Sequence, residues 1–335
     1  MMEEQTSKSK AKVFDEIEKG IRGENESLDI GLPKLGRYMN IRKRILTLIF
    51  SNTGAGKSSY LDEIMLNACE SMDNGSKLKA DFQLFALERS QELRTAKWLS
   101  RKVFIEEGVS IEVPKMLGWW KEKMNASEIH MVKKYRPWLE HILNDYITIH
   151  EGAKNPKAFF KIIRDVFEAR GEFEKIKVFD KKMGRERLVE IYKPKDDNII
   201  ICPCIDHGNL IQTTPDYPTK KQAIDQTVQY MQSFRDYGAA PFWISQVNRS
   251  ISGISRLKDS EYELTLDDVK ESGDIGDACD IALALFDPLK FGQSSKTLYN
   301  PQDFIDRSNG SNFFRQATIV KSSYGIDTVS YTHLR

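Results

Sequence analysis

A lysine and a serine that directly follow a loop of small residues have the clearest chemical potential in this chain. Residues 45–50 are largely apolar and β-branched, residues 51–56 are small, and Lys57 and Ser58 open a helical pattern. In such a strand–loop–helix, backbone N–H groups and the positive end of the helix dipole bind anionic oxygens. The lysine reaches the β- and γ-phosphates, and the serine hydroxyl binds the Mg²⁺ that bridges them. The pattern predicts a phosphate-binding loop of Ser51, Asn52, Thr53, Gly54, Ala55, Gly56, Lys57, Ser58 and Ser59.

The loop departs from the usual G-x-x-x-x-G-K-[ST] pattern at one position, because Ser51 stands where the first glycine is expected. The segment that follows still favours a phosphate site. Apolar residues recur there at helical spacing and share one face, which puts the lysine and serine at a helix N-terminus. These residues are Leu61, Ile64, Met65 and Ala68. An ordinary glycine-rich turn between a strand and a helix is the alternative interpretation.

Three further polar residues follow or end predicted strands. Apolar runs precede Glu88 and Gln246, and another run ends in Asp206. Because strands of an open parallel sheet end along one rim, we expect these side chains beside the phosphate loop. Asp206 can hold Mg²⁺, and Gln246 can sense the γ-phosphate by hydrogen bonding. Glu88 can orient the attacking water, although an acid favoured by the first turn of a helix is an equally good interpretation.

Residues near two of these acids carry local structural signals. Ser90 is a plausible N-cap for the helix after Glu88. Pro203 interrupts the apolar run 199–206 and has no N–H for a strand ladder, so we expect a β-bulge there. His207 follows Asp206, and we interpret it as a hydrogen-bonded core residue rather than a catalyst.

Composition excludes several classes of protein. The 335 residues, 40% of them hydrophobic, suit one large domain or two small ones. No segment has the pattern of a membrane span or a signal peptide. The net charge of +1 argues against a protein that coats nucleic acid through bulk charge, but permits binding through local loops. The cysteines have neither zinc nor disulfide spacing and indicate reduced thiols of a cytosolic protein; they are Cys69, Cys202, Cys204 and Cys279.

The chain divides into a short leader, a main domain and a short tail. Residues 1–30 form a polar tail and a linker helix, whose apolar face must pack on this domain or on a neighbouring subunit. Residues 31–328 form the main domain, with a helical and hairpin insertion at about 105–195 that shows no chemistry. Residues 329–335 resemble translated sequencing-adapter sequence, so we expect a non-native tail there.

In their order along the chain, the motifs resemble the ATPase domain of DnaB-type replicative helicases, the hexameric branch of the RecA-like ATPases with its phage relatives. The matching segments are 51–58, 87–90, 205–207, 245–249 and 271–280. The resemblance runs from about Gly31 to Gly325. It accounts for Ser51, since this family often lacks the first loop glycine. It implies an α/β fold of the RecA-like P-loop NTPase type, with a mostly parallel central sheet flanked by helices.

The resemblance also implies a set of roles. It implies ATP and Mg²⁺ as cofactors, with Lys57, Glu88 and Gln246 as catalytic residues and with Ser58 and Asp206 at the metal. It implies a homohexamer around single-stranded DNA in a bacterial or phage-infected cytosol, with a primase or helicase loader as a possible partner and no membrane. The residues it implies at the DNA are Arg249, Lys270, Glu271, Ser272 and Gly273.

Two departures from the family matter. No separate N-terminal domain of the bacterial type precedes residue 30, so docking of a primase or loader through it is not implied. The Lys-x-Arg-x-Gly segment reads Lys-Ser-Ser-Tyr-Gly, so Ser323 stands where the arginine finger is expected. Such a finger is typically worth about 10³–10⁵ in rate. Lys321 remains as a candidate to act on a neighbouring subunit, and Arg315 is a candidate to replace the finger.

Three functions are compatible with these residues. The first is a ring-forming, ATP-driven DNA helicase. The second is a RecA-like recombinase or loader that binds DNA without unwinding it, which would form an open filament rather than a closed ring. The third is a regulatory or binding protein that does not hydrolyse ATP, which the serine at position 323 favours.

Overall fold

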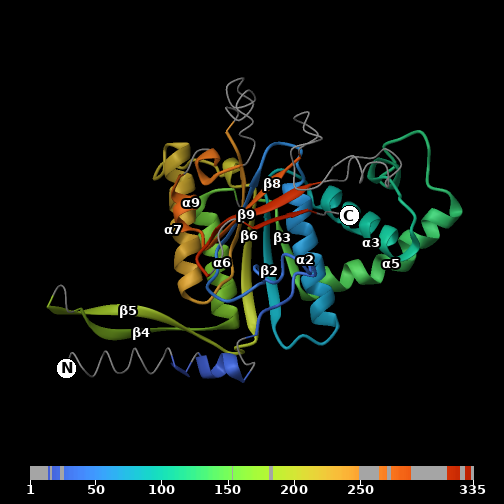
Figure 1. Cartoon of the computed structure of the whole chain (residues 1–335). Helices are drawn as coiled ribbons and strands as arrows, with labels where there is room; N and C mark the ends of the chain where they lie inside the picture. The colour runs from blue at the N-terminus through green and yellow to red at the C-terminus, as the bar shows by residue number, and fades with distance from the viewer. Residues whose placement is uncertain are drawn as a thin grey trace.

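The computed structural model describes residues 14–15, 17–22, 26–152, 154–180, 184–248, 264–269, 273–287, 315–324 and 329–332. Within these ranges, eight strands form one sheet (Figure 1). They are β1 (Thr47–Ser51), β2 (Lys79–Ala86), β3 (Ile147–His150), β6 (Ile199–Asp206), β7 (Phe242–Gln246), β8 (Ile281–Phe286), β9 (Gln316–Ser322) and β10 (Val329–Thr332). Their order is β10-β9-β8-β1-β7-β6-β2-β3. The strands from β8 to β3 are parallel, while β9 and β10 are antiparallel to their neighbours.

Helices cover both faces of the sheet, as Figure 1 shows. One side carries α2 (Lys57–Asp73), α3 (Gln91–Glu107), α4 (Val113–Met116) and α5 (Ala126–Asp145). The other side carries α6 (Pro156–Arg170), α7 (Lys220–Asp236) and α9 (Gly273–Ala278). The short 3₁₀ turns η1 (Gly208–Leu210) and η3 (Leu266–Asp268) lie in connecting segments. The predicted fold class, a mostly parallel sheet flanked by helices, is confirmed. Within the described ranges, every helix is too short or too polar to cross a bilayer.

Each face of the sheet has its own hydrophobic core, because successive residues of a strand point to opposite faces. In β1, Ile49 joins the core that contains Leu61 and Met65 of α2. Its neighbours Leu48 and Phe50 join the second core, together with residues of α6 and α7. Both faces of β1 are therefore buried, as expected for a central parallel strand whose sequence is apolar throughout.

Polar side chains cap the starts of two helices, one of them as predicted. The Ser90 hydroxyl accepts a hydrogen bond from the N–H of Leu93 at 3.5 Å, so the predicted N-cap of α3 is confirmed. The Asn155 side chain accepts from the N–H of Ala158 at 3.0 Å and begins α6. Both caps bind N–H groups that have no partner within the helix, which fixes where the helix begins.

The prediction of a β-bulge at Pro203 is wrong. The ladder between β6 and β2 runs from Ile199 to Asp206 without a shift, and Pro203 pairs with Gln83. On the other side of β6, the register with β7 includes only Cys204 and Ile205. The proline therefore precedes the ladder with β7, and its missing N–H interrupts no run of bonds there.

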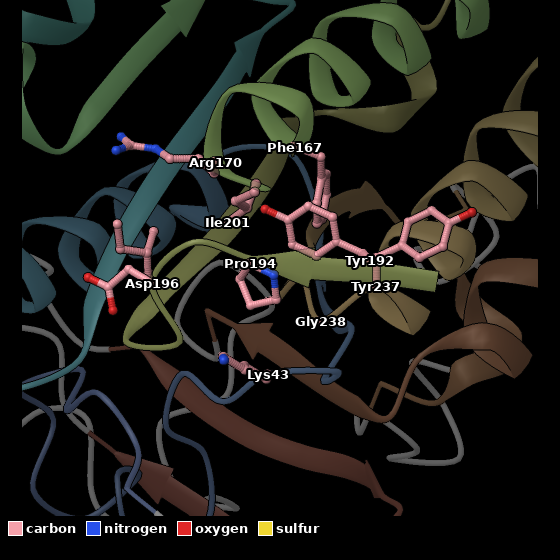
Figure 2. A pocket seen from close by; sticks show the side chains of 10 residues that line it. Lys43, Phe167, Arg170, Tyr192, Pro194, Asp196, Ile201, Tyr237 and Gly238 are labelled. Carbon is pink, nitrogen blue, oxygen red and sulfur yellow. The ribbon is translucent and has the colours of Figure 1, made fainter. Parts of the chain in front are cut away.

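A two-stranded hairpin lies outside the central sheet, between α6 and β6 (Figure 1). Its strands are β4 (Gly171–Asp180) and β5 (Arg185–Pro194). Figure 2 shows a hollow at its base, lined by Lys43 and Tyr192 among others and reaching Ile199, the first residue of β6. Asp206 ends β6. The hollow and the predicted phosphate loop therefore lie at opposite ends of the parallel strands.

Candidate nucleotide-binding site

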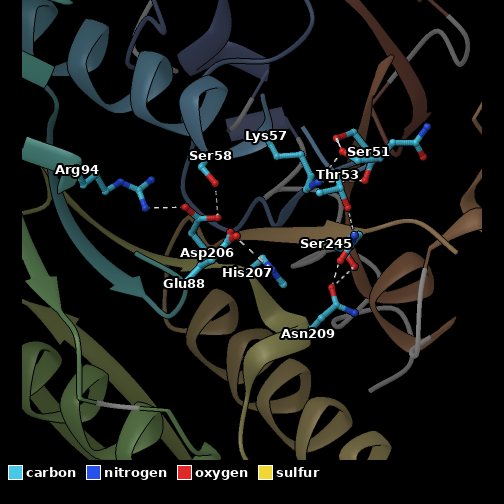
Figure 3. Close-up of polar contacts among 12 residues, drawn as sticks. Ser51, Thr53, Lys57, Ser58, Glu88, Arg94, Asp206, His207, Asn209 and Ser245 are labelled. Carbon is cyan, nitrogen blue, oxygen red and sulfur yellow. Dashed lines mark hydrogen bonds and ion pairs between the residues drawn. The ribbon is translucent and has the colours of Figure 1, made fainter. Parts of the chain in front are cut away.

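The carboxyl ends of the parallel strands bring the predicted site residues to one rim of the sheet. In the β1–β7 ladder, Ser51 is opposite Gln246. In the β2–β6 ladder, Ala86 is opposite Asp206, and Glu88 follows Ala86 by two residues. Figure 3 shows the side chains of this rim, with those of Ser58, Asp206 and His207 grouped below the phosphate loop. The rim predicted from strand ends is therefore present.

The phosphate loop connects β1 directly to α2. Gly54 and Gly56 have φ angles of 79° and 94°, in the left-handed region that favours glycine. A Cβ atom on Gly56 would meet nothing within 4 Å, so backbone conformation and not space accounts for the glycine. Gly56 is the N-cap of α2 and brings no side-chain acceptor, and the first turn holds no acidic residue. This helix N-terminus is thus suited to an external anion.

Lys57 is bound to the loop that precedes it. Its side-chain ammonium donates to the carbonyls of Ser51 at 3.1 Å and Asn52 at 2.9 Å, and the residue is only 8% exposed. These bonds connect the two ends of the loop and hold the ammonium beside the loop backbone. A buried ammonium beside an uncapped helix N-terminus fits a polyphosphate chain.

The residues predicted to hold Mg²⁺ are in direct contact. The Ser58 hydroxyl donates to Oδ1 of Asp206 at 2.9 Å. A hydroxyl and a carboxylate are the hard oxygen ligands that Mg²⁺ prefers, with waters and phosphate oxygens completing its shell. The pair offers two protein oxygens, which fits a Mg²⁺ ion whose other ligands are nucleotide phosphates and waters.

A buried arginine, which the sequence did not indicate, holds the other oxygen of Asp206. Arg94 of α3 donates from Nη1 to Oδ2 of Asp206 at 2.6 Å (Figure 3). It also donates from Nε to Oδ1 of Asp62 at 2.7 Å. Its side chain is 4% exposed. Burial alone would lower the pKa of Arg94, but the charges of the two acids outweigh it and raise the pKa. Burial raises the pKa of Asp62, against the pull of Arg94.

One local signal could have indicated part of this cluster. Asp62 follows Ser58 by four residues on α2, so both lie on the same helical face. Arg94 carried no such signal, because an arginine in an amphipathic helix normally faces solvent. Its burial depends on acids that lie 32 and 112 residues away in the sequence.

Glu88 and His207 face one another at the rim. The side chain of Glu88 is 47% exposed, and its Oε2 lies 3.8 Å from Nε2 of His207. Burial lowers the pKa of His207, so a neutral imidazole faces the carboxylate near pH 7. Nδ1 of His207 is buried without a hydrogen-bond partner among the described residues. The interpretation of His207 as a hydrogen-bonded core residue is therefore wrong for this nitrogen.

Gln246 contacts the phosphate loop, and its backbone is held by a residue that the sequence analysis missed. Its side-chain amide donates to the Thr53 hydroxyl. The N–H of Gln246 and the Ser245 hydroxyl donate to Oδ1 of Asn209, at 3.0 and 3.3 Å. A polar residue three positions after Asp206 was the available signal. Asn209 connects the ends of β6 and β7 and so orients the predicted sensor.

The two residues considered for action on a neighbouring subunit bind their own chain. Lys321 donates to the carbonyls of Gly276 and Asp277, both at 2.9 Å, near the end of α9. Arg315 donates from Nε to the carbonyl of Ala55 at 3.2 Å, within its own phosphate loop. The role predicted for Lys321 across a subunit interface stays a prediction.

The residues predicted to contact DNA fall mostly outside the described ranges. Arg249, Lys270, Glu271 and Ser272 lie there, and Gly273 begins α9. The segment before Lys270 is tied to the end of β7. Val247 forms a β-bridge with Val269, and the N–H of Asn248 donates to the carbonyl of Asp268 at 2.8 Å. The chain therefore approaches Lys270 from the rim that carries the phosphate loop.

Comparisons with known proteins agree on the fold. No family model matches the sequence, and no curated protein matches it. Among solved structures, an ATPase domain superimposes with a TM-score of 0.65 at 14% identity, covering 97% of this chain and 93% of that one. A DnaB-like replicative helicase, from a structure that also describes its interactions with primase, gives 0.66 at 15% identity. That match covers 96% of this chain and 64% of the helicase chain. The chain has the RecA-like fold of DnaB-type helicase ATPase domains.

Proposed function

We propose that this protein is an ATP-dependent replicative DNA helicase, a ring-forming motor that moves along single-stranded DNA and unwinds duplex. One observation carries the proposal: the phosphate loop, the metal pair and the predicted water-activating carboxylate lie along one rim of a RecA-like sheet. The motifs of the sequence and the likeness to helicase ATPase domains support it.

Each residue of the rim has a distinct task in this proposal. The loop N–H groups and Lys57 bind the β- and γ-phosphates, and Ser58 and Asp206 hold Mg²⁺. The metal ion, when bound, neutralises charge that develops on the transferred phosphoryl group. Glu88 orients the attacking water, since its half-exposed carboxylate lies beyond the end of β2. Gln246 touches Thr53 of the loop and so connects nucleotide state to β7.

The DNA-binding part of the proposal rests on charge and position. We propose that Arg249 and the segment from Lys270 to Gly273 contact phosphates of the strand inside a homohexameric ring. Such contacts are independent of sequence and weaken as salt rises, because bound counterions are released. The proposal also includes a primase or loader as partner and the cytosol as compartment. It divides the chain into residues 1–30, 31–328 and 329–335.

ATP turnover and strand separation test the function together. Wild-type protein is expected to hydrolyse ATP faster with single-stranded DNA and to unwind a forked duplex. Lys57→Ala is expected to abolish turnover, since the ammonium that contacts the phosphates is removed. DNA-stimulated turnover without unwinding would favour the recombinase or loader, and absent hydrolysis would favour a regulatory protein. Electron microscopy with nucleotide and fork distinguishes a closed ring from a filament.

Lys270→Glu tests the DNA contact separately. It is expected to weaken binding to single-stranded DNA and to reduce the slope of log affinity against log salt concentration by about one. Basal ATP turnover is expected to stay unchanged. Lys77→Glu, at an exposed lysine before β2, is the matched control. Equal affinities of the Lys270 variant and the wild type would remove this segment from the DNA path.

A further inference from the structure

The flank of the phosphate loop formed by β8 and β9 contains an arginine at an unexpected place. Ser323, where the related ATPases carry an arginine for the neighbouring subunit, is exposed, and its N–H donates to the carbonyl of Asp280 at 2.9 Å. Arg315 stands eight residues earlier, immediately before β9. It lies beside the phosphate loop of its own chain.

Sheet register explains why Arg315 reaches this loop. Strand β8 pairs with β1, so that Leu285 is opposite Ser51, the last residue of β1 and the first of the loop. Strand β9 pairs with β8, so that Gln316 is opposite Phe286. One residue beyond that antiparallel pair, Asp287 and Arg315 come together at the rim, with Nη1 of Arg315 3.2 Å from Oδ2 of Asp287.

Arg315 bridges this carboxylate and the loop backbone. Its Nε donates to the Ala55 carbonyl at 3.2 Å. The side chains of Arg315 and Asp287 are only 18% and 8% exposed. The planar guanidinium presents donors in a fixed fork, so one arginine can satisfy both acceptors at once. The carboxylate balances the charge of the guanidinium, which favours a role in holding the loop over a role as an unpaired positive charge.

The bond to Ala55 orients an N–H group that can donate a hydrogen bond to phosphate. The peptide between Ala55 and Gly56 is planar, so its N–H points away from its C=O. When Arg315 holds the Ala55 carbonyl, the N–H of Gly56 is held toward the opposite side. The two neighbouring peptides have bonds of their own, from the Ala55 N–H to the Asn52 carbonyl at 3.3 Å and from the Tyr60 N–H to the Gly56 carbonyl at 2.8 Å, so the bond from Arg315 acts on the peptide between them. Loop N–H groups of this kind bind phosphate oxygens.

We propose that Arg315 is a positioning residue that acts in cis: it holds the Ala55–Gly56 peptide of its own phosphate loop in the orientation that binds nucleotide. The inference rests on the proposed function, since it assigns a role within the same nucleotide site. It also makes the site less dependent on a neighbouring subunit, whose serine at position 323 cannot supply a guanidinium.

Nucleotide binding by Arg315→Ala is the first test. The affinity for ADP is expected to fall about 10-fold, the value of one hydrogen bond to a charged group. Hydrogen exchange is expected to rise in peptides covering residues 52–57 and to stay at the wild-type level in peptides far from the loop, while the melting temperature falls by only a few degrees because Asp287 loses its partner. Arg315→Lys is expected to recover part of the affinity, because an ammonium keeps the charge but lacks the fork. Arg136→Ala, at an exposed arginine paired with Glu140 on α5, is the matched control.

Unchanged ADP affinity together with unchanged exchange in the loop would overturn the proposal. A drop in melting temperature with no change specific to the loop would also overturn it, because that pattern marks general destabilisation. These readouts do not require hydrolysis. If the wild-type protein has no ATPase activity, the proposed function fails, while loop exchange and ADP binding still decide the role of Arg315.

Mixed assemblies distinguish action within a chain from action across an interface. Lys57→Ala and Arg315→Ala chains with different tags are mixed, and co-purification verifies that they assemble together. If Arg315 acts in cis, no chain in the mixture has both an intact lysine and an intact arginine, so turnover stays at the sum of the separate variants. Recovered turnover would mean that a Lys57→Ala chain lends its Arg315 to a neighbour, which overturns the proposal. If the chains do not co-purify, ADP affinity and loop exchange of Arg315→Ala decide the proposal.

Discussion

An arginine holds each flank of the phosphate loop, but the two arginines have different kinds of partner. On the β6 side, Arg94 binds two carboxylates, and its side chain is 4% exposed. On the β9 side, Arg315 binds one carboxylate and one backbone carbonyl, and its side chain is 18% exposed. The first arginine therefore acts on the acid that is expected to hold the metal, and the second acts on the shape of the loop.

The difference in burial decides what each arginine contributes. Around Arg94, removal of the cation would leave Asp62 and Asp206 as uncompensated charges away from water, which is costly. Around Arg315, only Asp287 would lose its partner, and the arginine itself is 18% exposed, so water can replace part of the lost interaction and the expected cost is smaller. We therefore expect the β6 flank to determine folding stability and metal binding, and the β9 flank to determine nucleotide affinity.

Arg94→Met is expected to lower the free energy of unfolding by about 3–5 kcal/mol, the usual cost of removing one partner of a buried ion pair. Urea denaturation measures this loss. Arg101→Met is the control on the same helix, where a half-buried bond to Glu63 should contribute about 1 kcal/mol or less. Equal losses in the two variants would contradict the division. Adding Asp62→Asn to Arg94→Met should recover part of the stability.

Glu88→Gln is expected to lower kcat about 100-fold, because the amide cannot accept a proton from the attacking water. Nucleotide affinity should stay within about twofold of the wild type, since Glu88 lies outside the loop that is proposed to bind phosphate. Steady-state ATPase kinetics and a fluorescent nucleotide titration give the two values. Glu92→Gln, which changes an exposed acid in the first turn of α3, is the control. Loss of binding instead of turnover would indicate a structural role for Glu88.

Asp287→Asn is expected to weaken ADP binding about three- to fivefold. The amide can still accept a hydrogen bond from Arg315 but no longer balances its charge, so the loop is held less firmly. Isothermal titration calorimetry measures the change, with Asp236→Asn as the control at an exposed acid. An effect on stability as large as that of Arg94→Met would show that the two flanks do not differ.

Lys321→Ala should have the smallest effect, a loss of about 0.5–1 kcal/mol of stability. Its side chain binds two carbonyls near the end of the short helix α9, and water can replace it there. Thermal unfolding provides the measurement. A loss of ATP turnover greater than about 10-fold at unchanged stability would instead support action of Lys321 on a neighbouring subunit.

Much of the site was predictable because its signals are local. An apolar run followed by small residues, lysine and serine specifies a strand, a loop and a helix N-terminus, and it predicted the loop from Ser51 to Ser59. The rule that parallel strands end along one rim then placed Glu88, Asp206 and Gln246 beside it. Ser90 was predicted as a cap for the same reason, since it binds an N–H only three residues away.

Other parts of the site depend on contacts between distant segments. Arg94 is buried because α2, α3 and β6 bring two acids to it, and a helical pattern alone would put that arginine in solvent. Asn209 holds the end of β7 because Gly208 packs so closely on Trp243 that a Cβ would lie 2.0 Å from its ring. Pro203 needs no bulge because the ladder with β7 begins one residue later.

Hydrophobic period and capping chemistry act over a few residues, so the class of fold, the strand ends and the predicted phosphate loop follow from local patterns. Which charges face one another depends instead on how distant segments pack. Arg315 shows this most clearly: its sequence position suggested a residue for a neighbouring subunit, whereas the pairing of β9 with β8 and of β8 with β1 puts it on the loop of its own chain. Side-chain partners that lie 260 residues apart are set by sheet register, which no local pattern encodes.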